Sequence, residues 1–584
     1  MKKRWLAVAT AFALGGLTYA QDAPQPKEAP QPAPAAAQEA GESEQAPQWP
    51  SEEQWQNDWQ GWSGDEGFPP EPPGGFEDDQ EWDEDGPPEP PEWDENGPPE
   101  PPEWGGNGAP EGARSQWPKD EQEWQKNWQN WTEDADFPPE PPEGFGPNGR
   151  NRQNGGRNRN FGGPGGPGGP GGPGGMRDQA SVEATAVYLL DGSKEKNEVT
   201  LEAPKYEATK QDESAVRLVN GARATLKNVT ATKTGNVSNE GESNFYALNA
   251  VMAAMGGSKL VIEGGTFTSD ARGANGFFAS GKGSEVTVSD ATFSSSRNSS
   301  RGLDATYGGK VTGNRLTLKT QGAHCAALAT DRGEGFIIAN SCKGETHGEG
   351  SPCVYSTGDI TLNDCQFIAY GSEAGVIEGK NSITLNNSVI EGKLKCGVML
   401  YQSFSGDAGV GTSVLKVTDS TIKATVGPMF YITNTRSKVF LQNATLEFES
   451  GKLIRAQADR WGRSGRNGGN VEFHATKQKL VGSISADAIS TITLKLDADV
   501  TLESAINEDG KAKAVNLSLL KNSTWSVSAD SHLTALDFGE AAAADAVQRI
   551  QSNGHSVTYD ASASPALDGK TYDLPGGGKL APAE

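Results

Sequence analysis

The chain is 584 residues long and combines 51 Lys and Arg with 78 Asp and Glu, which gives a formal net charge of −27. We expect no nucleic-acid partner, but the total charge says little about what a folded part of the chain binds, because it comes from one segment. The charge is unevenly spread, because residues 21–148 hold 33 acidic and 4 basic residues, a net of −29 that leaves +2 for all other residues.

Residues 1–20 have the pattern of a secretory signal peptide. Three basic residues precede an apolar run, and a small-residue cleavage site ends at Ala20. The apolar run is shorter than the roughly 18 to 20 residues that cross a bilayer, and no later segment is apolar enough to do so. We therefore expect export to the periplasm, the cell surface or the medium, without insertion into a membrane.

Residues 21–148 are rich in Pro, Glu, Asp, Gln and Gly and contain almost no Val, Ile or Leu, which predicts disorder. A duplication lies inside this region, with copies at residues 49–73 and 117–142. Each copy carries three tryptophans spaced at i, i+4 and i+7, namely Trp55/Trp59/Trp62 and Trp124/Trp128/Trp131. Such a stripe fits one face of a short helix that docks on a partner, or it belongs to a simple spacer, and both interpretations stay open.

Residues 149–180 contain several arginines followed by repeated Gly-Gly-Pro, a composition that resists both helix and sheet. We expect a flexible linker here.

From residue 181 the composition changes to Val, Ile, Leu, Thr, Ser, Asn and Gly, and a repeat of the form apolar-x-apolar-x-(Asn/Asp)-x-x-apolar begins. Six segments match it, the last imperfectly: Val286/Val288/Asp290/Phe293, Ile360/Leu362/Asp364/Phe367, Ile383/Leu385/Asn387/Ile390, Leu415/Val417/Asp419/Ile422, Val439/Leu441/Asn443/Leu446 and Ser518/Leu520/Asn522/Trp525. A second apolar motif, such as Gly397-Val398-Met399-Leu400, precedes these strands in phase. Short strands at this spacing predict a parallel β-helix with coils of about two dozen residues.

Alternation along each predicted strand places Val286 and Val288 inward and Thr287 outward. The Asn or Asp that follows tolerates a left-handed turn and can form a ladder with its equivalents in neighbouring coils. These residues therefore have a structural role rather than a catalytic one. We expect the β-helix proper over residues 181–480 and closing coils with a cap over residues 481–584.

The repeat resembles the pectin-lyase-like superfamily of right-handed parallel β-helices, particularly adhesin-like bacterial exports and autotransporter passengers. The resemblance covers residues 184–575, and no outer-membrane barrel pattern follows it. It implies an all-β solenoid and leaves three functions open. The chain is an adhesin-like protein that binds glycans or surface proteins, a polysaccharide lyase or glycoside hydrolase, or a structural envelope protein whose Trp-rich tail binds a partner.

Five cysteines in an exported chain permit disulfides. Cys325 and Cys353 hold equivalent places in successive coils, as do Cys342 and Cys365, and stacked strands lie within disulfide range. We therefore predict the pairs Cys325–Cys353 and Cys342–Cys365, with Cys396 free. A stack of buried thiols is the alternative.

Catalytic motifs are scarce in the repeat region. The five histidines are scattered and no paired C-x-x-C occurs, so we expect no metal site and no cofactor. The polygalacturonase type of this superfamily carries an adjacent Asp pair, which the repeat region lacks. Asp331, Arg332, Glu334 and Asp359 are the best candidates for lyase chemistry, although polar corners also carry such residues simply because they are solvated.

Two long insertions, near residues 402–412 and 457–470, fall at the same corner of nearby coils and should project side by side. Long loops on a rigid solenoid are a common place for recognition. The predicted ligand-binding residues are Arg455, Asp459, Arg460, Trp461, Arg463 and Arg466, because Trp stacks on sugar rings and Arg grips carboxylate or sulfate. A mobile basic loop, or a loop that contacts the acidic tail of the same chain, are the alternatives.

Overall fold

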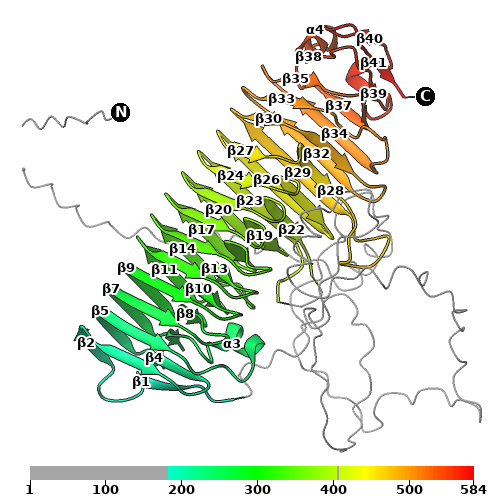
Figure 1. The fold of residues 1–584 in the computed structure, drawn as a ribbon. Coiled ribbons are helices and arrows are strands. Elements are labelled where there is room, and N and C mark those ends of the chain that lie inside the picture. The colour runs from blue at the N-terminus through cyan, green and yellow to red at the C-terminus, as the bar shows by residue number, and fades with distance from the viewer. Residues whose placement is uncertain (1–181, 404–406, 584) are drawn as a thin grey trace, which may run out of the picture. The chain divides into compact units, whose positions relative to one another are not determined.

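The computed structural model describes residues 182–403 and 407–583, and these form an all-β parallel solenoid (Figure 1). The predicted fold class is thus confirmed for this part of the chain. The predicted signal peptide (1–20), acidic region (21–148) and linker (149–180) lie outside the described residues.

One side of the solenoid is a 12-stranded parallel sheet, which we call sheet A. Its strands in spatial order are β1 (Thr185–Asp191), β4 (Glu213–Val219), β6 (Met252–Met255), β8 (Phe277–Ser280), β10 (Arg301–Thr306), β13 (Ala326–Thr330), β16 (Val354–Ser356), β19 (Gly375–Glu378), β22 (Val398–Tyr401), β25 (Phe430–Thr433), β28 (Lys452–Ala456) and β31 (Ser483–Ala486).

The second side, which we call sheet B, follows sheet A in each coil up to β32 and continues for two further strands. Its strands are β2 (Glu198–Glu202), β5 (Arg223–Lys233), β7 (Lys259–Ser269), β9 (Glu285–Ser295), β11 (Lys310–Asn314), β14 (Phe336–Asn340), β17 (Asp359–Asn363), β20 (Ser382–Asn386), β23 (Thr412–Thr418), β26 (Thr435–Gln442), β29 (Gly469–Thr476), β32 (Thr491–Leu496), β34 (Ala514–Leu519) and β37 (Ala535–Asp537).

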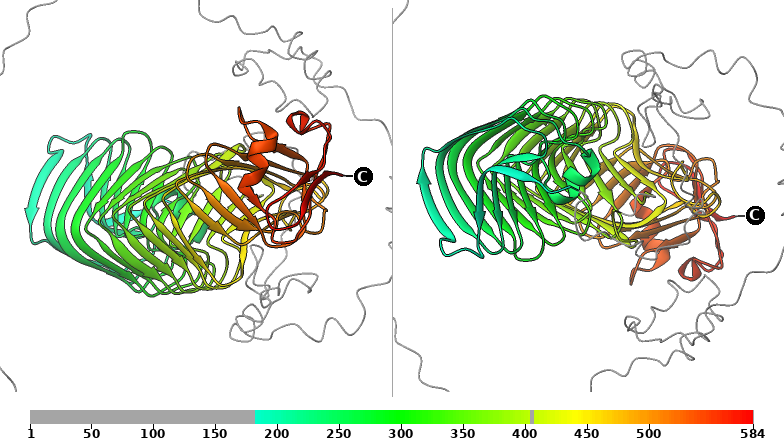
Figure 2. Two further views of the ribbon diagram at one scale, coloured as in Figure 1. Left: turned by 90° about the horizontal axis from the view of Figure 1, so that it is seen from above. Right: turned by 90° about the horizontal axis from the view of Figure 1, so that it is seen from below.

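The third side is reached through the turn after sheet B. Its strands are β3 (Lys205–Ala208), the later halves of β5, β7 and β9, then β12 (Thr317–Thr320), β15 (Lys343–Thr346), β18 (Gln366–Ala369), β21 (Val389–Gly392), β24 (Thr421–Ala424), β27 (Thr445–Phe448), β30 (Lys479–Val481), β33 (Thr501–Ser504), β35 (Thr524–Val527) and β38 (Ile550–Gln551). From above and from below, the coils stack on one another along the length of the solenoid (Figure 2), and buried apolar side chains fill its interior.

The interior is built from the positions that the repeat predicts. In β9, Val286 and Val288 are buried in the core, whereas Thr287 faces outward and is half-buried. Their partners in β7 are Leu260 and Ile262, so apolar side chains stack on apolar side chains from coil to coil. Each coil is too thin to bury its own apolar face, and stacking joins these faces into one continuous core.

The turn from sheet B to the third side uses a left-handed residue in coil after coil. The Asn and Asp residues of the repeat take positive φ values, among them Asp364 (56°), Asn387 (46°) and Asp419 (49°). Side chains at this turn also bond across coils, with Asn387 Nδ2 donating to Asp364 Oδ1 at 2.6 Å. The predicted structural role of these residues is confirmed.

A second ladder, one residue earlier, joins asparagines at the ends of four sheet B strands. The Nδ2 atoms of Asn340, Asn363 and Asn386 each donate at 2.9 Å to the Oδ1 atom of the asparagine in the preceding coil, which begins with Asn314. Each amide pairs with its neighbour, so none of these four side chains is a buried unpaired polar group.

The imperfect match at Ser518/Leu520 is wrong by one residue. Leu517 and Leu519 point inward in β34, and the left-handed residue is Lys521 with φ of 49°. A slip of one residue exchanges the two faces of a strand, which is why the pattern misplaced both positions.

The solenoid closes at its C-terminal end. Sheet A stops at β31, and a small sheet of β36 (Ser531–Leu533), β39 (Val557–Tyr559), β41 (Lys579–Pro582) and β40 (Tyr572–Asp573) follows. The strand β40 pairs antiparallel with β41. Two short helical segments, α4 (Ala543–Ala546) and η2 (Val547–Arg549), bury Ala546 and Val547 against the last coils.

Candidate functional site

The outer face of sheet A changes its side chains from coil to coil. The register places in one row, in order, Phe278, Asp304, Ala329, Tyr355, Val376, Met399, Tyr431 and Arg455. Three long connections border this row, namely residues 234–251 with α3 (Glu240–Tyr246), residues 402–411 and residues 457–468. The latter two both lead from sheet A to sheet B, as their predicted common corner requires (Figures 1 and 2).

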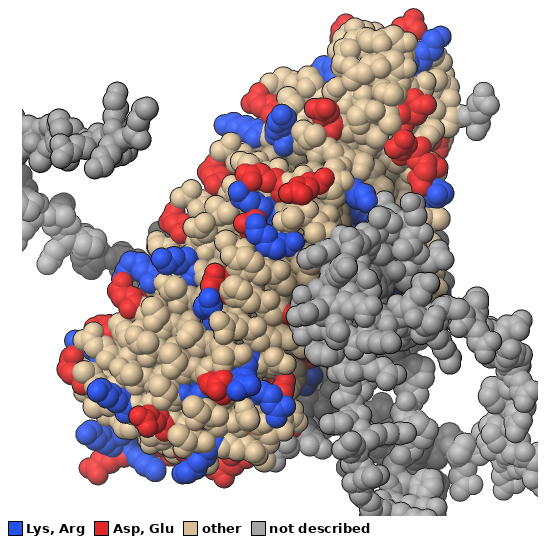
Figure 3. All heavy atoms as spheres, viewed as in Figure 1, with Lys and Arg blue, Asp and Glu red and all other residues tan. Residues whose placement is uncertain are grey.

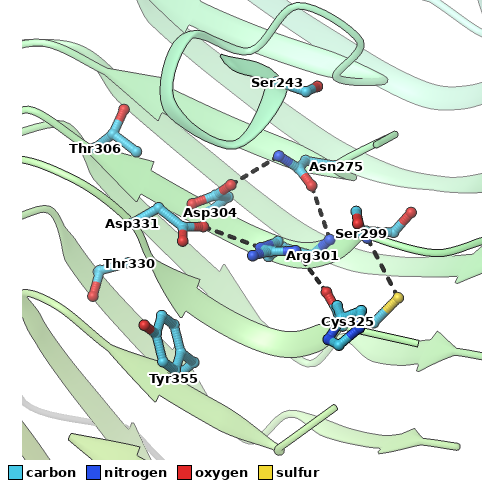
Figure 4. A network of polar contacts seen from close by, with 12 residues as sticks. Ser243, Asn275, Ser299, Arg301, Asp304, Thr306, Cys325, Thr330, Asp331 and Tyr355 are labelled. Carbon is cyan, nitrogen blue, oxygen red and sulfur yellow. Dashed lines mark hydrogen bonds and ion pairs between the residues drawn. The ribbon is translucent and has the colours of Figure 1, made fainter. Parts of the chain in front are cut away.

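A buried polar cluster lies around Asp304 of the row, between residues of β10 and the end of β13 (Figure 4). Arg301 Nε lies 3.0 Å from Asp331 Oδ2, and Arg301 Nη1 donates to the His324 carbonyl at 2.8 Å. The Asn275 amide contacts two residues of β10. Its Nδ2 donates to Asp304 Oδ2 at 2.8 Å, and its Oδ1 accepts from the backbone N–H of Arg301 at 2.9 Å.

Two carboxyl groups therefore share one guanidinium away from solvent. Burial raises the pKa of Asp304 well above its ordinary value, and the nearby Asp331 carboxylate raises it further, while Arg301 opposes both effects. Burial also raises the pKa of Asp331 against the lowering effect of Arg301. The Asp304 Oδ1 atom has no hydrogen-bond partner within the described part of the chain. These features favour a protonated Asp304.

The connection that carries α3 crosses the outer face of sheet A. Phe278 of the row packs against Ala247 and Ala253, and the Thr306 hydroxyl donates to the Phe245 carbonyl at 2.9 Å. The Arg332 guanidinium lies 4.1 Å from the centre of the Phe245 ring.

Arg332 also contacts Asp407, which belongs to the connection of residues 402–411. Its Nη2 atom lies 2.6 Å from Asp407 Oδ1, and its Nε atom donates to the same oxygen at 2.8 Å. Arg332 therefore links Phe245 of α3 to Asp407, next to the end of β13.

Glu378, at the end of β19, accepts hydrogen bonds from two tyrosine hydroxyls. The Tyr355 hydroxyl donates to Glu378 Oε2 at 2.5 Å and the Tyr401 hydroxyl donates to the same oxygen at 3.0 Å. Burial raises the pKa of both phenols well above the ordinary range, and the Glu378 carboxylate adds to the effect. Both rings are thus fixed as neutral donors beside one acid.

The connection of residues 457–468, which we call the 457–468 loop, is anchored at both ends. Tyr431 donates its hydroxyl to Asp459 Oδ2 at 2.7 Å, and the Ala458 backbone N–H donates to Asp487 Oδ2 at 2.7 Å. The buried Asn467 side chain donates from Nδ2 to the Asp459 carbonyl at 2.6 Å. The loop therefore has a defined path.

The side chains of this loop place an aromatic ring among arginines. The Trp461 and Tyr401 ring centres lie 5.4 Å apart at 56°, and the Arg460 guanidinium lies 4.9 Å from the Trp461 ring centre. Arg460, Arg463 and Arg466 are exposed. None of these three arginines forms an ion pair with another residue of the described ranges 182–403 and 407–583.

Arg455 lies apart from the exposed arginines, in the row itself. Its Nε atom donates to Gln457 Oε1 at 2.6 Å, and burial lowers its pKa. Five of the six predicted ligand-binding residues thus lie in the 457–468 loop, and Arg455 lies on the preceding strand β28, with Asp459 and Arg455 both engaged in hydrogen bonds.

No side-chain hydrogen bond or ion pair joins the four predicted catalytic residues, all of which lie in the described part of the chain. Asp331 is buried in the polar cluster, and Arg332 lies over α3. Glu334 Oε1 instead lies 2.8 Å from Lys380 Nζ, and the exposed Asp359 accepts from a serine hydroxyl at 2.6 Å. Only the first two therefore lie near the outer face of sheet A.

Neither predicted disulfide is formed, since all five cysteines are free and buried. For Cys325 and Cys353 the reason is register. Leu328 pairs with Val354, which places Cys353 opposite Ala327 rather than opposite Cys325. The two thiols consequently do not stack.

Cys342 and Cys365 do stack as predicted, yet as thiols. The Cys342 backbone N–H donates to Cys365 Sγ at 3.4 Å, and the Cys365 N–H donates to the Ser388 hydroxyl at 3.0 Å in the next coil. The thiols thus act as acceptors in a column that serine hydroxyls continue.

The sequence did not single out Asp304, Tyr355, Glu378, Tyr401 or Tyr431. All five belong to the sheet A strands, whose apolar motif was recognised only as a repeat. A signal was present, because outward positions of that motif alternate with the core and carry acids and tyrosines where a plain scaffold would carry Thr or Ser.

No protein-family model, no curated protein and no solved structure matches the chain. Among the described residues, no group of three or more His, Cys, Asp or Glu side chains is arranged to hold a metal ion. Within the same residues, no helix has the length and hydropathy needed to cross a bilayer.

Proposed function

We propose that this chain is an exported, adhesin-like member of the pectin-lyase-like β-helices that binds anionic glycans at the 457–468 loop. One observation carries this function: a tryptophan ring lies against both a tyrosine ring and an arginine guanidinium at the edge of the most varied face of the solenoid. The distances are 5.4 Å from Trp461 to Tyr401 and 4.9 Å from Trp461 to the Arg460 guanidinium.

This combination suits acidic sugars. An aromatic face packs on the C–H face of a sugar ring, and a guanidinium binds a carboxylate or sulfate through paired hydrogen bonds. Anchoring by Asn467 and Asp487 holds the loop in place before a ligand arrives, which lowers the entropy lost on binding. Export directed by the predicted signal peptide, residues 1–20, would bring this site to the envelope or the cell surface.

The test is binding of the full chain to a panel of uronic-acid and sulfated polysaccharides. The double variant Trp461→Ala plus Arg460→Ala should weaken binding by about tenfold to a hundredfold, since a charged hydrogen bond and an aromatic contact are lost together.

A matched control removes one exposed aromatic residue and one exposed arginine from sheet B, in the variant Phe440→Ala plus Arg223→Ala. It should bind as the parent chain does. Equal affinities of all three proteins would reject the 457–468 loop as the glycan site.

Polysaccharide cleavage is a second candidate, and one observation favours it. Asp304 and Asp331 lie close together on the outer face of sheet A with raised pKa values, and a neutral carboxyl group is the state that a general acid requires. Both are buried, so a substrate would reach them only if the α3 connection moved aside. Turnover of the same polysaccharide panel, abolished by Asp331→Asn, would establish it.

A further inference from the structure

We propose that the second acidic Trp-bearing repeat, residues 117–142, docks on the 457–468 loop of the same chain. The interaction depends on charges that both segments carry, so it stands whether or not the loop also binds a glycan. Residues 117–142 would then cover the 457–468 loop, which is unusually cationic.

The charge of the loop region contrasts with that of the solenoid. Residues 182–584 carry a net charge of −5, but residues 452–468 within them carry five basic residues and one acidic residue, a net of +4. The single acid, Asp459, accepts from the Tyr431 hydroxyl at 2.7 Å and from the Arg460 backbone N–H at 2.6 Å. Its charge is therefore directed into the anchor of the loop.

Elsewhere the two signs are mixed. On the face drawn in Figure 3, acidic and basic side chains are interspersed, and neighbouring coils pair them, as Lys227 does with Glu202 and Glu263 at 3.4 and 3.7 Å. Arg460, Arg463 and Arg466 have no such acid among the described residues. A cationic cluster without local acids attracts an anionic segment most strongly.

Residues 117–142 match this cluster in charge and in apolar character. They hold seven acidic and two basic residues, a net of −5, together with Trp117, Trp124, Trp128 and Trp131. The loop offers guanidinium groups for the carboxylates, and it offers Trp461 beside Tyr401 for aromatic contact. Arg also stacks favourably on indole rings.

The chain is long enough for this contact. Residue 142 lies 43 residues before Thr185 at the start of β1. Ten strand spacings along sheet A separate β1 from β28, which amounts to about 48 Å. A chain segment of 43 residues spans roughly 36 Å r.m.s. if it has random-coil dimensions, and its full extension is about 140 Å.

The first repeat, residues 49–73, has a net charge of −6 and its own Trp stripe, so it is the natural control within the chain. Docking of residues 117–142 closes the shorter loop, and a shorter loop costs less conformational entropy. The structure and the chain order therefore point to the second repeat.

The test measures backbone amide hydrogen exchange of residues 457–468 in the full chain. The tested variant replaces the seven acids of residues 117–142, at positions 120, 121, 123, 133, 134, 136 and 140, by Asn or Gln. Exchange in the loop should become several-fold faster. High salt should accelerate exchange in the parent chain and have little effect on the variant, because salt screens exposed charges.

Two further variants complete the experiment. Neutralising the six acids of residues 49–73 should leave exchange in the loop unchanged. Reversing Arg460, Arg463 and Arg466 to Glu should remove protection of residues 117–142, and changing the acids of that segment to Lys in the same chain should restore it.

Three results would overturn the interaction. Exchange of the loop could be unaffected by the neutralised second repeat, which would follow if that repeat pairs with the arginines of residues 149–180. Both neutralised repeats could give the same acceleration. The reversed charges could fail to restore protection.

Discussion

Sheet B and the outer face of sheet A belong to the same coils but differ in regularity. Along sheet B, identical side chains repeat from coil to coil, as in the asparagine ladder from Asn314 to Asn386. Along the outer face of sheet A, successive positions hold an acid, an alanine and a tyrosine. Sheet B stacks like side chains on like and serves as scaffold, whereas several positions on sheet A contact the long connections, each in its own way.

The largest expected effect comes from removing the only cation of the buried cluster. Arg301→Met leaves Asp304 and Asp331 buried together without a counter-charge, which should lower the free energy of unfolding by about 3–5 kcal/mol. The measurement is the urea midpoint of the full chain, followed by near-ultraviolet circular dichroism.

The matched control is Arg297→Met, which removes an exposed arginine whose Nε atom lies 2.7 Å from Asp270. An exposed pair contributes roughly 0–1 kcal/mol. If the two variants shifted the midpoint equally, the buried cluster would have no special place in the stability of sheet A.

The next prediction concerns pH and Asp304. Its folded-state pKa is raised by burial and by Asp331, so the folded state holds this proton more tightly than the unfolded chain does. Stability from this group is present below the unfolded pKa of about 3.9 and is lost as pH rises through the folded pKa. Asp304→Asn removes the ionisation and should make the chain more stable than the parent at pH 7.5, but not at pH 3.5.

Unfolding of the parent and the variant at the two pH values tests this directly. Asn can keep the hydrogen bond from Asn275, so the comparison isolates the charge. Asp359→Asn, at an exposed corner on sheet B, is the matched control for the loss of one carboxylate. A gain that is the same at both pH values would contradict a raised pKa at Asp304.

The contrast between the two faces also explains what the sequence could predict. The repeat identified the inward pair Val286/Val288 and the left-handed turns at Asp364 and Asn387, because these depend on local spacing and backbone preference. The ion pair of Arg301 with Asp331 was not predictable in this way. It joins side chains 30 residues apart, from different coils, under a connection that belongs to neither.

The cysteines illustrate the same limit. Equivalent motif positions suggested that Cys325 stacks on Cys353, but the coils differ by insertions at the corner before the strand, and the register moved Cys353 opposite Ala327. Where no insertion intervenes, between Cys342 and Cys365, the alignment was right and only the bond was wrong.

The smallest effect is expected where a regular column already tolerates exchange. Cys342 and Cys365 accept backbone N–H groups through sulfur at 3.5 and 3.4 Å, and Ser388 and Ser420 accept the equivalent groups through hydroxyls at 3.0 and 3.0 Å. Cys342→Ser should therefore lower the free energy of unfolding, measured by urea denaturation, by less than about 1 kcal/mol, because the hydroxyl oxygen accepts the same hydrogen bond.

Cys353→Ser is the comparison that gives this result meaning. Cys353 is fully buried in the core, and its nearest polar contact is from Sγ to the Glu391 carbonyl at 3.7 Å, so a hydroxyl there loses apolar packing and gains only a long contact. Cys353→Ser should lower the free energy of unfolding by about 1–3 kcal/mol. If Cys342→Ser and Cys353→Ser lowered the free energy of unfolding equally, Cys342 would behave as an ordinary core residue. The polar acceptors of its column would then not contribute to the stability of the edge beside sheet B.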